Sequence, residues 1–178
     1  GLLGGGLQNY FQWNLTNDQG TNPQSGYSSK IFTDLAMDWV GAQEQPWFLW
    51  LAYNAPHTPF HSPPSIMHNQ GELANYSDGM DPMPYYLAAI EAMDFQIGRL
   101  LNGLTQEERD NTIILFMGDN GTPNEVGQSP YAGNAVKGSL YQGGINVPLF
   151  VSGKGVQRSG NDYNLSLIHI SEPTRQQG

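Results

Sequence analysis

Apolar residues recur at helical spacing in two stretches of the chain. In residues 29–40 one helical face collects the apolar side chains, namely Ile31, Phe32, Leu35, Ala36, Trp39 and Val40. Gly41 follows at the end of this stretch, as is typical after a helix. In residues 81–104 a similar face follows Asp81-Pro82, a cap and then a proline at the first helical position. The spacing predicts a helix in each stretch.

Three shorter apolar runs have the length of strands: residues 47–53, 112–117 and 147–151. The first two are continuous, which is typical of strands that are buried on both faces of a parallel sheet. The order helix, strand, helix, strand, loop, strand predicts an α/β fold with helices on the faces of the sheet.

Four other stretches show neither helical spacing nor a strand-length apolar run. They are rich in polar residues, glycine or proline: residues 1–28, 59–84, 105–111 and 118–144. We expect turns or loops in all of them. A loop as long as 59–84 is usually functional in a compact domain.

The composition excludes several classes of function. The net charge is −9, from 16 acidic and 7 basic residues, so we expect no nucleic-acid partner. The chain has no cysteine, which excludes disulfides, thiolate metal sites and a cysteine nucleophile within these residues. No apolar run approaches the ~18 residues of a membrane span. The 178 residues start without Met or a signal-like segment, so we expect an internal fragment of a longer protein.

Polar residues that could carry chemistry follow the predicted strands. Ligands of open α/β sheets bind outside the carboxyl ends of the strands. His57 follows the first predicted strand, Asp119 and Asn120 follow the second, and Lys137 precedes the third. Asp119 and Asn120 offer hard oxygen ligands suited to Ca²⁺ or Mg²⁺, although Asp-Asn-Gly is also a common turn.

His57 and Lys137 each allow two interpretations. A histidine in a loop at a strand end could act as a general acid or base, or it could be an ordinary surface histidine. Prolines at 56 and 59 rule out a helical zinc pair of His57 and His61. Lys137, flanked by glycines, could neutralise an anionic oxygen or simply be solvated. Glu91 and Asp94 are predicted to be residues of a polar helix face.

Taken together, four blocks of the sequence point to one family. They are PWFLWLAYNAPHTPF, YYLAAIEAMDFQIGRLL, NTIILFMGDNG and KGSLYQGGINVPLFV. In order and spacing they resemble the sulfatases of the alkaline-phosphatase superfamily, from about Gly1 to about Val156. The resemblance implies part of an alkaline-phosphatase-like α/β/α sandwich with a mostly parallel sheet, whose N-terminal strands would precede this sequence.

The resemblance also implies a reaction, the hydrolysis of small-molecule or carbohydrate sulfate esters. In such enzymes a formylglycine, made from Cys or Ser, is hydrated to a diol beside a Ca²⁺ ion, and one hydroxyl attacks sulfur. By resemblance Asp119 and Asn120 are Ca²⁺ ligands, and Lys137 binds a sulfate oxygen. His57 would bind the sulfate and help to protonate the leaving oxygen. A periplasmic or secreted location is expected from the family, without a signal peptide in this fragment.

The sequence departs from the family pattern in several places. The Cys/Ser-x-Pro-x-Arg motif and the first metal-binding acids are expected upstream of these residues, so the fragment by itself is predicted to be inactive. Asn146 stands where many relatives have Arg, so we do not expect the salt-bridge or anchoring role of that Arg at this position. Two alternatives stay open: a phosphate or phosphonate ester hydrolase of the same superfamily, and a non-catalytic relative.

The end of the chain contains a misleading match. Residues 171–175, SEPTR, fit Ser-x-Pro-x-Arg, but they follow every other block and have no apolar helix after them. LSLIHISEPTR resembles a translated adapter from sequencing-library preparation. We therefore expect residues 1–164 to be the central fragment of a catalytic domain and residues 165–178 to be a non-native tail.

Overall fold

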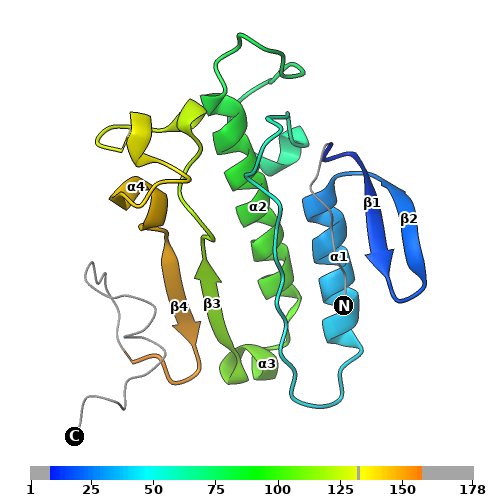
Figure 1. Ribbon diagram of the computed structural model, residues 1–178. Coiled ribbons are helices and arrows are strands. Elements are labelled where there is room, and N and C mark those ends of the chain that lie inside the picture. Colours follow the sequence, from blue (N-terminus) through cyan, green and yellow to red (C-terminus); the bar gives the residue numbers. More distant parts are fainter. Residues whose placement is uncertain (1–8, 132, 158–178) are drawn as a thin grey trace, which may run out of the picture.

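The computed structural model describes residues 9–131 and 133–157 of the chain (Figure 1). Its helices are α1 (Ser28–Gly41), α2 (Met83–Gly103), α3 (Gln106–Asn111) and α4 (Gln142–Ile145). Its strands are β1 (Gln12–Asn17), β2 (Gly20–Ser25), β3 (Ile113–Met117) and β4 (Leu149–Gly153). Three short 3-10 turns lie at Ser65–Met67, Asn124–Val126 and Gly133–Ala135.

The two predicted long helices are confirmed and pack against each other. α2 buries a row of small residues, Ala88, Ala89 and Ala92, which lets neighbouring elements approach its axis closely. An ion pair between Arg99 of α2 and Asp34 of α1, at 2.9 Å, joins the helices at their rim. The Arg99 pair is partly exposed, so apolar burial rather than charge is the main source of stability here.

β3 and β4 pair in antiparallel register, from Ile113 opposite Gly153 to Met117 opposite Leu149. β1 and β2 also pair antiparallel, so neither strand pair of the described residues is parallel, although the sequence predicts a mostly parallel sheet. The reason lies in the connection 118–148. It returns to the end where β3 finishes, with Gly118 N donating to Pro148 O at 3.0 Å, so β4 must run back along β3.

The predicted first strand, residues 47–53, is extended but is not part of a hydrogen-bonded sheet in the structure. It lies alongside α1, where the Tyr53 hydroxyl bonds Thr33 Oγ1 at 2.7 Å. Its odd-numbered side chains are half-buried, whereas Phe48 and Trp50 are 83% and 82% exposed. β3 shows the same alternation, with Leu115 56% exposed. The prediction of burial on both faces is therefore wrong for this chain, because the described residues cover only one face.

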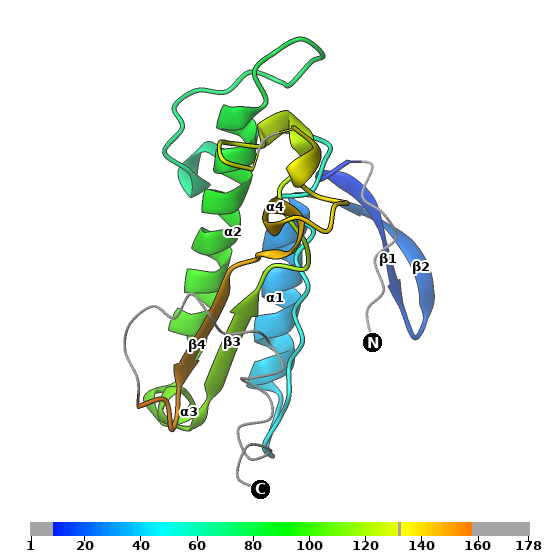
Figure 2. The same ribbon diagram turned by 60° about the vertical axis from the view of Figure 1, so that its left-hand side comes forward.

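Residues 12–25, predicted as loop, form the hairpin β1–β2, which lies on the opposite side of α1 from β3 and β4 (Figures 1 and 2). The hairpin is mostly polar and contains Pro23, so it lacks the apolar alternation that predicts a strand. A tertiary anchor holds it instead. Trp13 is buried, donates from Nε1 to Gly26 O at 3.2 Å, and contacts the Phe32 ring of α1 at a centroid distance of 4.9 Å.

Residues 105–111, predicted as a turn, contain helix α3. A capping box begins it: Thr105 Oγ1 accepts from Glu108 N at 3.2 Å, and Glu108 Oε2 accepts from Thr105 N at 2.7 Å. This T-x-x-E pattern is a helix signal that can be recognised in the sequence. α3 and α4 lie at opposite ends of the β3–β4 pair (Figures 1 and 2).

The long loop is confirmed over residues 59–82, apart from its one 3-10 turn, whereas Met83 and Pro84 belong to α2. Glu91, expected to be only a polar-face residue of α2, holds this loop. Its carboxylate accepts from Asn69 N and from Gln70 Nε2, each at 2.5 Å, and the Asn69 amide is the first cause of a lowered pKa of Glu91.

Within the part of the chain that the structure describes, no helix is long and apolar enough to cross a bilayer.

Candidate active site

His57 lies in a tight turn that follows the extended segment 47–53. Its backbone N donates to Asn54 O at 2.9 Å, which closes the turn. Its imidazole is exposed, and Nδ1 lies 2.8 Å from Thr58 O. Because a carbonyl oxygen only accepts, Nδ1 must carry the hydrogen of this bond. Nε2 is then the nitrogen that can exchange a proton with a ligand.

Asp119 and Asn120 follow β3 directly and have exposed side chains. Asn120 Nδ2 donates to Asp119 Oδ2 at 2.7 Å, so the amide and the carboxylate lie side by side. Oδ1 of each residue is left to accept from, or coordinate, a ligand. Two oxygen atoms of this kind suit Ca²⁺ in type, but a Ca²⁺ shell holds ~6–8 of them. The described residues contain no cluster of three or more His, Cys, Asp or Glu that could complete the shell.

Two backbone hydrogen bonds bring Lys137 to the Asp119-Asn120 turn. Lys137 N donates to Thr122 O at 2.9 Å, and Gly121 N donates to Gly144 O at 3.0 Å. The Lys137 side chain is exposed. Asp119 and Lys137, 18 residues apart in sequence, thus lie on two loops that cross each other: the loop after β3 and the segment from Lys137 to Gly144.

The crossing depends on glycine. A Cβ atom at Gly121 would overlap the carbonyl oxygen of Gly143, and a Cβ atom at Gly144 would overlap that of Ser139. Both obstacles are backbone atoms, which cannot move aside as a flexible side chain can. The glycines of DNG and of YQGG are therefore explained by close backbone contact rather than by a positive φ angle.

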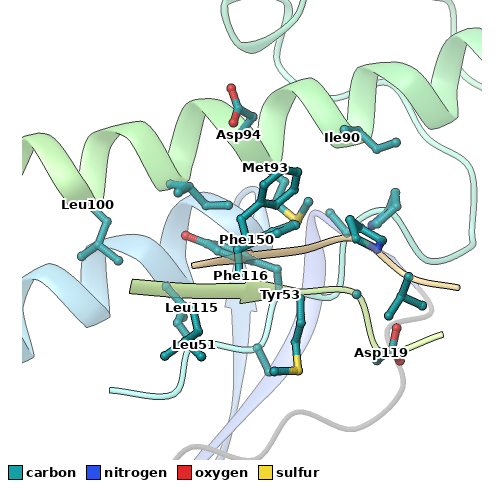
Figure 3. Close-up of a pocket in the computed structure, with 18 of the residues that line it drawn as sticks. Leu51, Tyr53, Ile90, Met93, Asp94, Leu100, Leu115, Phe116, Asp119 and Phe150 are labelled. Atoms are coloured by element: carbon teal, nitrogen blue, oxygen red, sulfur yellow. The ribbon is translucent and has the colours of Figure 1, made fainter. Parts of the chain in front are cut away.

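All four predicted residues, His57, Asp119, Asn120 and Lys137, line one open pocket between residues 47–58, α2, β3 and the loop after β3. Figure 3 shows Ile90, Met93 and Leu100 of α2 along one side and Leu115, Phe116 and Asp119 along the other. Asn146 lines the same pocket at the end of α4. Apolar side chains of 47–53, α2 and β3 line most of the pocket, and charged residues line both ends, with Asp119 and Lys137 near the end of β3 and Glu107, Glu108 and Lys154 at the other end.

A buried aromatic cluster next to His57 was not predicted from the sequence. The His61 ring stacks on Tyr10 at a centroid distance of 3.8 Å, and His61 Nε2 lies 3.3 Å from the Tyr27 hydroxyl. Burial raises the pKa of Tyr27 to about 12, and burial, with Tyr27 beside it, raises the pKa of Tyr10. The aromatic residues of the segment 1–28 were the available signal, but they follow no period that would place them together.

Acid is expected to loosen this cluster through His61. Burial lowers the pKa of His61 from 6.5, partly offset by its bond to the Pro59 carbonyl. Folding thus favours the neutral ring, so its contribution to stability is complete above pH ~6.5 and is lost as pH falls through the lowered pKa. Tyr10 and Tyr27, which face the ring, stay neutral in this range. The measurement is the melting temperature between pH 7.5 and 5.

The matched variant for this measurement is His61→Phe, which keeps a stacking ring and removes the titrating group. Its melting temperature should fall less between pH 6.5 and 5 than that of the wild-type protein. Equal pH dependence of the two proteins would show that His61 does not cause the loss. Carboxylates with lowered pKa values, such as Asp34, titrate below this window.

A family profile and two curated relatives that match this sequence all carry the description sulfatase or arylsulfatase. A family profile described as Sulfatase matches residues 4–174. The uncharacterized sulfatase YdeN of Escherichia coli K12 is 34% identical over 78% of this chain and 25% of its own length. The arylsulfatase of Klebsiella aerogenes is 27% identical over 85% of this chain and 50% of its own length. The chain thus spans a quarter and a half, respectively, of these two relatives.

The fold is shared with a solved structure. The crystal structure of Ps i-CgsB in complex with k-i-k-neocarrahexaose matches with a TM-score of 0.61 and 28% identity, over 79% of this chain and 31% of that one. The match confirms the expected α/β class, a partial domain of the alkaline-phosphatase type. The tail 165–178 and its Ser171 lie outside the described residues, so its interpretation stays a prediction.

Proposed function

Because this chain belongs to the sulfatase family, we propose that it forms the central part of an enzyme that hydrolyses sulfate esters. The observation that supports this most directly is the shared pocket. A carboxylate-amide pair, a lysine and a histidine, contributed by separate loops, line one open pocket, and backbone hydrogen bonds join the first two near the carboxyl end of β3. That combination provides cation ligands, an anion-binding group and a proton donor for one negatively charged substrate.

In this proposal Lys137 binds a non-bridging sulfate oxygen. Sulfate ester hydrolysis builds negative charge on these oxygens and on the leaving oxygen, and a fixed ammonium group stabilises that charge. The bond from Lys137 N to Thr122 O fixes the backbone of this lysine relative to Asp119. The lysine is thereby kept close to the loop that would hold the cation.

His57 is proposed to bind the sulfate group and donate a proton to the leaving alcohol. The bond from Nδ1 to Thr58 O orients the ring and leaves Nε2 to carry that proton. The leaving alkoxide of a sugar is a strong base, so protonating it lowers the barrier most for such substrates.

Asp119 and Asn120 would hold a Ca²⁺ ion together with acids from the rest of the protein. When bound, the cation would lower the pKa of the nucleophile and offset the charge of the sulfate. The nucleophile, a formylglycine by family resemblance, is expected outside this sequence, which has no cysteine. We therefore propose that the 178 residues alone have no activity.

Two relatives suggest the classes of substrate to test. The Klebsiella relative is an arylsulfatase, and Ps i-CgsB was crystallised with k-i-k-neocarrahexaose. We therefore propose a small aryl sulfate or a sulfated carbohydrate as the substrate, and a periplasmic or secreted location for the enzyme.

The test is a comparison of hydrolysis of nitrophenyl sulfate, nitrophenyl phosphate and a nitrophenyl phosphonate by the complete protein that carries this sequence. We expect sulfate to be preferred, and Lys137→Ala to lower kcat/KM for it by roughly 10²- to 10³-fold. The matched control is Lys154→Ala. Lys154 follows the end of β4, at the end of the strand pair away from Asp119, and its Nζ bonds Asn111 Oδ1 at 2.7 Å. Preference for phosphate or phosphonate would assign the other ester class. No hydrolysis of any of the three would favour a non-catalytic relative.

A further inference from the structure

We propose that Tyr10 is a positioning residue for His57, acting through its hydroxyl group on the backbone of the turn that carries the histidine. The inference rests on the proposed function for its consequence in catalysis, and on geometry alone for its structural part. Tyr10 lies 47 residues away from His57 in sequence. It precedes strand β1 in a segment that carries no catalytic motif.

The Tyr10 hydroxyl lies 2.9 Å from Asn54 O and 2.7 Å from His57 O. These are the first and last carbonyl groups of the turn, so one phenol group contacts both of its ends. His57 N also donates to Asn54 O, and Pro56, between them, has no N–H to donate. The phenol therefore supplies polar contacts that the turn's own backbone does not.

The ring of Tyr10 is fixed from several sides. Tyr10 is 1% exposed, and its ring stacks on His61 at an interplanar angle of 19°. Its own backbone O accepts from Ser28 N at 2.9 Å, at the start of α1. Hence the position of the hydroxyl is set by the hairpin, by α1 and by His61 together. A group held this firmly can hold the His57 peptide in turn.

The orientation of that peptide determines where the imidazole lies. The ring is itself held by the bond that Nδ1 donates to Thr58 O, the next carbonyl along the chain. If the 57–58 backbone rotates, Nδ1 loses this partner or the ring moves with it. A proton donor displaced by about 1 Å can lose roughly 10²-fold in rate. Tyr10 thus contributes to catalysis without touching the substrate.

The first test is structural and does not need activity. In the complete protein, Tyr10→Phe should raise the hydrogen-exchange rate of the His57 amide at least about tenfold. The matched control is Thr33→Val, because Thr33 is 0% exposed and its hydroxyl also makes two bonds, to Ser29 O at 2.8 Å and to the Tyr53 hydroxyl. Thr33→Val should loosen α1 and leave the His57 amide unchanged. An equal effect of both variants on that amide, or none, would overturn the proposal.

The second test connects the turn to the reaction. For Tyr10→Phe we expect kcat to fall roughly 10- to 100-fold with a sugar or alkyl sulfate, with KM changed less than threefold. The loss with nitrophenyl sulfate should be at least fivefold smaller, because nitrophenolate leaves without needing a proton. Thr33→Val should show no such dependence on the leaving group.

Parallel measurements on His57→Gln separate the two ways in which the idea can fail. If His57→Gln shows no dependence on the leaving group, the proposed acid role of His57 is wrong, whatever Tyr10 does. If His57→Gln shows it and Tyr10→Phe does not, His57 is the acid and Tyr10 does not position it. Dependence in both variants, with rapid exchange of the His57 amide in Tyr10→Phe, is the result expected here.

Discussion

Replacing Asp119 by alanine is expected to lower the affinity of the complete protein for Ca²⁺ by at least about 100-fold and to abolish measurable ester hydrolysis. Asp119 is the one carboxylate of the turn after β3, and its neighbour Asn120 is held against it at 2.7 Å. The substitution removes a ligand and also the partner that orients the second ligand. Loss of an indirect partner alone typically costs 10–100-fold in metal affinity, so loss of the ligand should cost at least as much.

Calorimetric titration with Ca²⁺ and nitrophenyl sulfate hydrolysis would measure the two effects. Asp110→Ala is the matched control, since Asp110 is an exposed aspartate on α3, at the opposite end of β3, and accepts from Gln106 Nε2 at 2.9 Å. It removes the same charge and should leave Ca²⁺ affinity and activity within about twofold. Unchanged Ca²⁺ affinity in Asp119→Ala would remove Asp119 from the metal site.

Replacing Gly121 by alanine is expected to destabilise the protein by about 1–3 kcal/mol and to lower activity by at least the effect of losing Lys137. The added methyl group would overlap the Gly143 carbonyl, so the two loops must separate. That separation breaks the bond from Gly121 N to Gly144 O and moves Lys137 away from Asp119. Gly144→Ala should act in the same way, through the carbonyl of Ser139.

Urea unfolding and kcat/KM of the same preparations check this prediction. Gly98→Ala is the matched control, because Gly98 lies within α2 and a Cβ atom there would meet nothing within 4 Å. Alanine is the better helix former, so this variant should gain about 0.5–1 kcal/mol and keep its activity. If Gly121→Ala were as stable and active as Gly98→Ala, the close crossing of the loops would not hold the site together.

The amino-acid sequence alone determined the elements whose signal is local. The helices at 28–41 and 83–103 follow from apolar spacing and flanking glycine and proline, and both are present. The apolar runs placed β3 and the extended segment 47–53 correctly along the chain. The position of His57 and Asp119 directly after such runs made them candidates, because loops after strands are where ligands bind. Their roles came from the resemblance of the four sequence blocks to the sulfatases.

Only the tertiary structure decided which segments meet. The spacing of apolar residues indicates that a segment is buried, but it does not indicate which other segment covers it. The sequence therefore could not show that one face of β3 is exposed in this chain or that β4 runs antiparallel to β3. The polar hairpin β1–β2 forms because Trp13 and Tyr10 anchor its ends in distant neighbours, which no local pattern encodes. Tyr10 contacts backbone carbonyls of the His57 turn, and Lys137 is joined to the Asp119 loop by a bond between two backbone groups. Any residue supplies a backbone carbonyl or amide, so these bonds leave no mark in the sequence until the fold brings their partners together.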